Sequence, residues 1–189
     1  MKRIYLVRHC KASGQERDAK LSEEGMRQAE RLADFFSEKE IDFIVSSPFE
    51  RAISTIQPLS SRLGLTLHTD DRLSERVLSR HNVADWMDQL RESFDDLDRK
   101  LPGGESSREA MDRGISVIHA LFEREENNMV AVTHGNLFSL ILKYYDDSIG
   151  FEDWRALANP DVFELCKQEQ SGEVSIKHLE VLSFLEKND

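Results

Sequence analysis

The stretch Ile4-Tyr5-Leu6-Val7-Arg8-His9 indicates the fold class most directly. Its apolar residues run without interruption and then stop at an arginine and a histidine. Continuous apolar runs rich in β-branched residues are typical of strands that are buried on both faces of a parallel sheet. Two further runs of this kind occupy residues 41–45 and 129–132. The sequence therefore predicts a sheet in which these segments are parallel strands.

Helical patterns lie between and after these runs. Apolar residues recur at helical spacing after Ser22, after Pro48, after Ser106 and after His134. Ser106 and Glu109 form a capping box, which marks a helix N-terminus. Strands that alternate with helices predict an α/β fold, here a three-layer α/β/α sandwich with a mostly parallel central sheet.

The length of 189 residues favours one domain that spans residues 1–189. Residues 161–167 and 173–181 are expected to form a hairpin or an edge pair of strands. Between residues 76 and 104 the pattern changes to an acidic helical segment. We expect a small helical insertion here that acts as a lid over the end of the sheet, while one further packing helix explains the same pattern equally well.

The chain is acidic, with 25 Lys and Arg residues against 36 Asp and Glu residues and a formal net charge of −11. Proteins that grip nucleic acid usually carry a basic stripe, which this sequence lacks. No apolar run approaches the ~20 residues that cross a bilayer, and the N-terminal run is too short for a signal peptide. Two cysteines without CxxC spacing fit a reducing compartment. We therefore expect a cytoplasmic protein with no nucleic-acid and no membrane partner.

The remaining histidines give no metal-binding pattern. His68, His81, His119 and His178 form no HxxxH or HxH pair. His119 and Glu123 make one i,i+4 pair, which is more typical of a helix surface. We expect no metal site.

Polar and cationic side chains follow the predicted strands where each strand ends. Arg8 and His9 come directly after the first strand, Arg51 lies one helical turn beyond the second, and His134 follows the third. Ligands of open parallel sheets bind outside the carboxyl ends of the strands, so these side chains should converge. Taken singly, each is more often a surface ion pair or a packed histidine. Together they predict a site for an anion such as phosphate, whose geometry guanidinium groups match.

Four segments resemble, in order along the chain, the signatures of the histidine phosphatase superfamily, also called phosphoglycerate-mutase-like: Arg8-His9, residues 21–29, residues 46–52 and residues 133–136. The resemblance extends from the first strand to about residue 165. It implies an α/β fold with the 76–104 segment near the active site. It also implies a metal-independent phosphomonoester hydrolase that needs no cofactor and acts on a small-molecule phosphoester.

By this resemblance His9 is the nucleophile that becomes phosphohistidine, Arg8, Arg51 and His134 hold the phosphoryl oxygens, and Glu75 is the proton donor. Neighbouring cations favour the neutral, nucleophilic form of His9. Two arginines and a protonated His134 would balance the charge of the phosphoryl group without a metal. Glu75 would give its proton to the leaving oxygen and then activate the water that hydrolyses phosphohistidine.

Backbone and acidic groups complete the predicted site. Gly135 and Asn136 begin the helix after His134, so their N–H groups can donate to phosphate. Asp70 and Asp71 are rivals to Glu75 for the role of proton donor.

The chain departs from the family pattern beside the nucleophile. Cys10 stands where the family usually has Gly, Ala12 where it often has Thr or Ser, and Gln15 where it often has Asn. The amide of Gln15 is still expected to bind substrate, and Ser13 or Lys11 could replace the lost hydroxyl.

Cys10 raises a rival mechanism, because cysteine-based phosphatases place a thiolate in a C-x5-R loop. Counting from Cys10, the sixth following position is Glu16, and Arg17 comes one residue too late. We therefore expect Cys10 to be a buried packing residue.

Two other functions stay open. A phosphoglycerate mutase would use the same site, but residues 77–82 lack the His-Tyr-Gly signature and the arginine pair that such mutases carry. A non-catalytic sensor of phosphorylated ligands is compatible with the changes at Cys10 and Ala12. Neither the physiological substrate nor the oligomeric state follows from the sequence.

Overall fold

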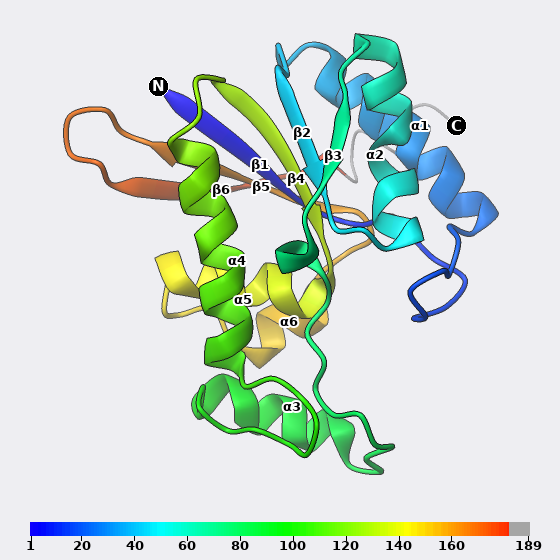
Figure 1. Cartoon of the computed structure of the whole chain (residues 1–189), viewed down its shortest axis with the longest axis vertical. Coiled ribbons are helices and arrows are strands. Elements are labelled where there is room, and N and C mark those ends of the chain that lie inside the picture. The colour runs from blue at the N-terminus through cyan, green and yellow to red at the C-terminus, as the bar shows by residue number, and fades with distance from the viewer. Residues whose placement is uncertain (182–189) are drawn as a thin grey trace.

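The computed structural model describes residues 1–181 of the chain. A six-stranded sheet crosses the molecule (Figure 1) in the order β3-β2-β4-β1-β5-β6. The strands are β1 (Lys2–Arg8), β2 (Phe43–Ser46), β3 (Leu67–Thr69), β4 (Asn128–Thr133), β5 (Asp161–Lys167) and β6 (Val174–Leu179).

The sheet is mostly parallel. β1 pairs with β4, β4 with β2, and β2 with β3, all in parallel register. β5 and β6 form the antiparallel hairpin expected from the sequence and extend the sheet beyond β1. The short edge strand β3 escaped prediction because three partly exposed residues carry no apolar period. Since β1, β2 and β4 run in one direction, their carboxyl ends meet at one edge of the sheet.

Helices cover both faces of this sheet, which confirms the predicted three-layer fold. In Figure 1, α1 and α2 lie on one side and α4 and α5 on the other. The helices are α1 (Glu23–Ser37), α2 (Glu50–Leu63), α3 (Trp86–Asp95), α4 (Ser107–Phe122), α5 (Gly135–Tyr145) and α6 (Phe151–Ala156). In residues 1–181, none of these helices has the length and apolar character needed to cross a membrane.

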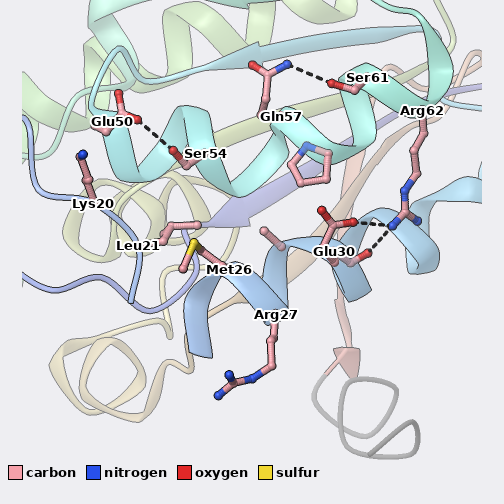
Figure 2. A pocket seen from close by; sticks show the side chains of 12 residues that line it. Lys20, Leu21, Met26, Arg27, Glu30, Glu50, Ser54, Gln57, Ser61 and Arg62 are labelled. Carbon is pink, nitrogen blue, oxygen red and sulfur yellow. Dashed lines mark hydrogen bonds and ion pairs between the residues drawn. The ribbon is translucent and has the colours of Figure 1, made fainter. Parts of the chain in front are cut away.

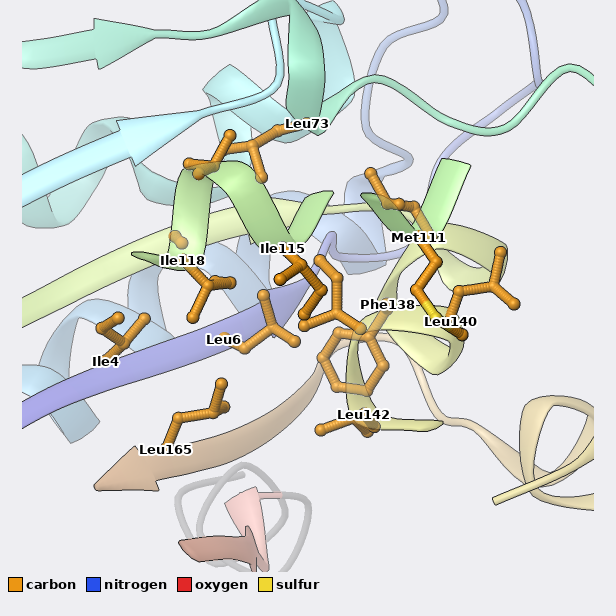
Figure 3. Close-up of a cluster of buried hydrophobic side chains, with 14 of the residues drawn as sticks. Ile4, Leu6, Leu73, Met111, Ile115, Ile118, Phe138, Leu140, Leu142 and Leu165 are labelled. Atoms are coloured by element: carbon orange, nitrogen blue, oxygen red, sulfur yellow. The ribbon is translucent and has the colours of Figure 1, made fainter. Parts of the chain in front are cut away.

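The alternation of side chains along β1 explains its continuous apolar run. Tyr5 and Val7 belong to the core beneath α1 and α2, whereas Ile4 and Leu6 belong to the core beneath α4 and α5. Figure 3 shows this second core around Phe138 of α5. Both faces of β1 are buried, so residues that point to either face need to be apolar.

Local capping fixes where the principal helices begin and end. The Ser22 hydroxyl accepts a hydrogen bond from the Gly25 N–H at 3.0 Å and caps α1. The capping box of Ser106 and Glu109 begins α4, as predicted. Gly64 ends α2 in the left-handed conformation, with φ of 65°.

The segment 76–104 contains one helix, α3, between irregular stretches. Figure 1 places α3 at the far end of the molecule from the N-terminus, beside α6. The rings of Phe94 and Phe151 pack edge to face at 6.4 Å, and those of Trp86 and Trp154 at 6.5 Å. The short helix α6 was not predicted from the sequence. The role of residues 76–104 as a lid stays a prediction.

Candidate active site

His9 directly follows β1 and is almost fully buried, with 6% of its surface exposed. Its Nδ1 lies 2.7 Å from the Cys10 carbonyl oxygen, so Nδ1 carries the proton and Nε2 carries the lone pair. The Asn159 amide donates to the His9 carbonyl at 2.7 Å. Burial, with Arg51 and Arg8 nearby, lowers the pKa of His9 to about 4 against the opposing effect of the Cys10 carbonyl. His9 is therefore a neutral, oriented imidazole at physiological pH.

Arg51 extends from the first turn of α2 and is 1% exposed. Its Nε donates to His9 Nε2 at 3.2 Å. Its Nη1 donates to the carbonyl oxygens of Gln15 and Glu16 at 3.1 and 2.7 Å, and the guanidinium lies 5.0 Å from the Phe49 ring centre. The loop after β1 thus holds Arg51 beside His9 Nε2.

Arg8 ends β1 and points its guanidinium toward the start of α5. Its Nη1 donates to the carbonyl oxygens of Leu157 and Ala158 at 2.8 and 3.1 Å. A Cβ added to Gly135 would lie 3.1 Å from Arg8 Nε, so the guanidinium packs against this glycine. Burial lowers the pKa of Arg8, and the charges of Glu75 and Asp161 oppose that shift.

His134 lies at the end of β4 and is fully buried. Its ring centre is 5.1 Å from that of His9, and its Nε2 is 2.7 Å from the Ser47 hydroxyl. Burial, then the neighbouring His9 and Arg51, lower the pKa of His134 to about 2. The expectation of a protonated His134 is therefore wrong for the free protein: four nearby titratable or cationic groups disfavour another positive charge.

Glu75 lies just beyond a 3₁₀ turn (Asp71–Leu73) that was not predicted. Its Oε2 accepts from the Asn136 N–H at 3.1 Å, and its Oε1 accepts from the Leu137 and Arg76 N–H groups at 3.1 and 2.8 Å. The Glu75 carboxylate thus lies at the N-terminus of α5. Burial lowers the pKa of the site arginines Arg8 and Arg51, and the charge of Glu75 opposes that shift.

This placement corrects one detail of the predicted phosphate site. The Asn136 N–H donates to Glu75 and not toward a phosphate position. Gly135 is the first residue of α5, where an N–H has no partner within the helix. Of the two predicted backbone donors, the Gly135 N–H is the one that Glu75 does not engage, and its donation to an anion stays a prediction.

The rival proton donors are engaged on the surface. Asp70 makes an ion pair with Arg72 at 2.7 Å. Asp71 is exposed and lies 3.4 Å from Arg17. Glu75, by contrast, lies close enough to Arg8 and Arg51 for its charge to raise the pKa of both arginines.

The loop after the nucleophile serves the site through its backbone. The Ser13 hydroxyl donates to the Lys20 carbonyl at 3.0 Å, which closes the loop. Gln15 contributes its carbonyl oxygen to Arg51, while its side chain is exposed. Neither side chain is held in the site, so their roles in binding substrate stay predictions.

Cys10 is a buried packing residue, as expected. It has no exposed surface, and its N–H donates to the Thr55 hydroxyl at 2.9 Å. Burial raises the pKa of the Cys10 thiol to about 12, so the nucleophilic thiolate is absent at neutral pH.

Buried polar atoms without a partner gather around His9 and its neighbours. Of the six such atoms in the described part of the chain, four belong to Arg8, His134 and Asn136: Arg8 Nε, His134 Nδ1 and both polar atoms of the Asn136 amide; the other two are Arg99 Nε and Tyr145 Oη. Buried polar groups normally have partners, so this concentration indicates a site that a polar ligand completes. No group of three or more His, Cys, Asp or Glu side chains within residues 1–181 is arranged to hold a metal ion.

Several contributors to the site were missed by sequence reasoning. Ser47 orients His134, Thr55 fixes the Cys10 backbone, and Asn159 holds the His9 carbonyl. Ser47 stands within one of the quoted motifs, but Asn159 lies about 150 positions from its partner and carries no local signal.

A groove of about 880 Å³ lies elsewhere, between α1 and α2. Figure 2 shows its walls, including Met26 on α1 and the ion pair of Arg62 with Glu30. None of the strand-end residues lines this groove, so it is separate from the cluster around His9.

Comparison with known sequences supports one family. The model of the histidine phosphatase superfamily (branch 1) matches residues 4–175. A relative from Hydrogenobacter thermophilus named "Putative phosphoserine phosphatase 2" is 31% identical over 157 residues, covering 75% of this chain and 77% of the relative. A glucosyl-3-phosphoglycerate phosphatase of Mycolicibacterium vanbaalenii is 27% identical over 169 residues, covering 75% and 72%.

Solved structures share the fold over almost the whole chain. Bacillus stearothermophilus YhfR superposes with a TM-score of 0.79 at 20% identity, covering 98% of this chain and 100% of that one. A mycobacterial glucosyl-3-phosphoglycerate phosphatase in complex with inorganic phosphate gives a TM-score of 0.74 at 24% identity, covering 95% and 96%. With the family model matched from β1 to β6, this chain belongs to the histidine phosphatase superfamily.

Proposed function

We propose that this protein hydrolyses phosphomonoesters through a phosphohistidine at His9, without a metal ion. One observation carries the proposal: the neutral His9 holds its Nε2 lone pair 3.2 Å from Arg51 Nε, in a buried site. A phosphoryl group that enters beside Arg51 therefore meets the nucleophilic atom and a compensating charge together. Phosphoryl transfer depends mainly on such positioning and charge compensation.

In the first step His9 Nε2 forms a bond to phosphorus while the bond from phosphorus to the ester oxygen breaks. Arg8 and Arg51 balance the charge of the phosphoryl oxygens, with the Gly135 N–H as a further donor. A phosphate dianion would also favour proton uptake by His134. Glu75, which enters the cycle in its protonated form, passes its proton to the leaving oxygen, so that a neutral alcohol departs.

In the second step water attacks the phosphorus of phosphohistidine. The Glu75 carboxylate accepts a proton from this water, the bond between phosphorus and His9 Nε2 breaks, and inorganic phosphate leaves. His9 and Glu75 return to their starting states. The cycle consumes one ester and one water and needs no redox partner or metal.

The substrate we propose is a small phosphomonoester. The two sequence relatives carry the names of phosphatases for phosphoserine and glucosyl-3-phosphoglycerate, which are small molecules. Those names favour hydrolysis over the mutase reaction that the sequence leaves open.

The test is release of phosphate from p-nitrophenyl phosphate in the presence of EDTA. We expect activity in the wild type, a loss of about 10⁴-fold in His9→Ala, and a change below ~3-fold in the matched neighbour Cys10→Ser. Loss of activity with EDTA, or full activity in His9→Ala, contradicts the proposal. Interconversion of 2- and 3-phosphoglycerate faster than phosphate release would establish a mutase, and binding without turnover a sensor.

A further inference from the structure

The backbone around Glu75 is held by an ion pair from outside the catalytic cluster. Arg113 on α4 and Glu105, just before α4, together contact the chain on both sides of Glu75, and we call this pair the Arg113–Glu105 clamp. The two side chains are 20% and 28% exposed. Neither residue belongs to a family signature quoted above, and neither lies at the end of a strand.

Arg113 holds the chain on the N-terminal side of Glu75. Its Nη1 donates to the carbonyl oxygens of Arg72 and Ser74 at 2.7 and 2.8 Å. The carbonyl between them, that of Leu73, accepts from the Thr133 hydroxyl of β4 at 2.7 Å. Three consecutive carbonyl groups before Glu75 are therefore tied to α4 and β4.

Glu105 holds the chain on the C-terminal side. Its backbone N–H donates to the Val77 carbonyl at 2.7 Å, and its Oε2 accepts from the Val77 N–H at 3.3 Å. Its carbonyl accepts from Arg76 Nε and Nη2 at 3.2 and 3.1 Å. Arg76 and Val77, the two residues after Glu75, are thus both bonded to Glu105.

The ion pair itself joins these two halves. Arg113 Nε and Nη2 donate to the two carboxylate oxygens of Glu105 at 2.7 and 2.8 Å, the bidentate geometry that only a guanidinium provides. All three nitrogens of the Arg113 guanidinium are in use, two toward Glu105 and one toward the turn. A lysine could supply the charge but not this fork.

We propose that Arg113 is a positioning residue that sets the place of the Glu75 carboxyl group relative to the leaving oxygen. The proposal builds on the proposed function, in which Glu75 transfers the proton. Thr133 of β4 holds one carbonyl of this turn, while the clamp holds the carbonyls of Arg72 and Ser74 and the backbone of Val77, so the geometry of the turn depends largely on the clamp. A loosened turn leaves Glu75 chemically intact but moves it from the ester oxygen, and a small displacement of a proton donor is costly to the step that needs it.

The experiment compares esters that differ in leaving group. Arg113→Met, Arg113→Lys and Glu105→Gln are assayed with p-nitrophenyl phosphate, whose leaving group needs little protonation, and with an alkyl phosphate, whose leaving group needs a proton. We expect kcat/KM, which reports formation of phosphohistidine, to fall about 30-fold for the alkyl ester and less than ~3-fold for the aryl ester. Arg108→Met removes a guanidinium from the same helix, where Arg108 pairs with the exposed Asp98, and should change neither.

Two further results decide the matter. In Glu75→Gln, adding Arg113→Met should cost nothing more for the alkyl ester, since the group being positioned is already gone. Equal losses for both esters, full activity in Arg113→Lys, or additive losses with Glu75→Gln would overturn the proposal. If Arg113→Met does not fold, Arg113→Lys and Glu105→Gln decide by the same ratio. A wild type without phosphatase activity is a different outcome, which contradicts the proposed function itself.

Discussion

The proposed nucleophile, His9, and the proposed acid, Glu75, are held by different kinds of interaction. His9, Arg8 and Arg51 lie at strand ends or in the first turn of a helix and donate to backbone carbonyls of loops packed against the sheet: those of residues 10, 15, 16, 157 and 158. Glu75 lies in an irregular turn that side chains of another layer hold, chiefly Arg113. The sheet and its loops thus fix the proposed nucleophile, whereas the turn of the proposed acid depends on side chains of α4 and β4 and on the N–H groups that begin α5.

This difference predicts two patterns of kinetic damage. Substitutions at the strand ends change how the phosphoryl group is bound or attacked. All phosphomonoesters share that group, so the rate should fall equally for every ester. Changes near Glu75 should affect esters according to how much their leaving group needs a proton.

The largest effect is expected for Arg51→Met. The variant removes the charge beside His9 Nε2 and leaves the carbonyls of Gln15 and Glu16 without their donor. We expect kcat/KM to fall roughly 10³-fold for aryl and alkyl esters alike. Arg62→Met, at the exposed end of the same helix, serves as the control and should stay near wild type. A loss in Arg51→Met that depends on the leaving group would erase the distinction between the two regions.

A smaller and selective loss is expected for Glu75→Gln. The amide keeps the size of the side chain but transfers no proton, so kcat/KM, which reports formation of phosphohistidine, should fall about 10²-fold for an alkyl phosphate and only a few-fold for p-nitrophenyl phosphate. The plot of log(kcat/KM) against leaving-group pKa should become steeper than in the wild type. A parallel plot would mean that Glu75 only helps to bind substrate.

A loss of roughly tenfold in kcat/KM is expected for Gly135→Ala. The new methyl group would lie 3.1 Å from Arg8 Nε and 3.3 Å from its Nη2, so the guanidinium must shift. The loss in kcat/KM should come from a higher KM and should be equal for both ester types. Gly150→Ala, where the nearest atom is 4.0 Å away, is the control. Unchanged kinetics in Gly135→Ala would mean that Arg8 has freedom to move.

The smallest effect is expected from lowering the pH from 7 to 5. Burial and the two site arginines lower the pKa of His9 to about 4, so the imidazole stays neutral over this range and gains a proton only as the pH falls through 4. Less than ~20% of the protein molecules should therefore have a protonated His9 at pH 5. NMR titration of ¹³C-labelled histidine measures this directly. A midpoint near the ordinary value of 6.5 would contradict the buried environment described here.

The strand-end residues could be predicted because one rule delivers them. A parallel sheet brings the carboxyl ends of its strands to one edge, so Arg8, His9 and His134 meet there whatever the loops do. Arg51 follows from its place one turn into α2. The same reasoning predicts the three layers, because the apolar runs identify strands that are buried on both faces.

The acid side could not be predicted in the same way. Nothing local in the sequence indicates that the carboxyl of Glu75 takes the N–H groups of Asn136 and Leu137, about 60 positions away. Arg113 and Glu105 resemble ordinary charges of a solvated helix surface until the fold brings them to the turn. The neutral His134 escaped prediction for a related reason, since its pKa depends on burial and on cations from three other segments.

The most direct test of the central claim is to trap the phosphoenzyme. Brief reaction with a ³²P-labelled phosphoester followed by alkaline quenching and peptide mapping should place an acid-labile, base-stable label on His9, and Glu75→Gln should lengthen its lifetime by slowing attack of water. We expect label on His9 in the wild type and none in His9→Ala. Label that survives acid, or that maps to another residue, would contradict it.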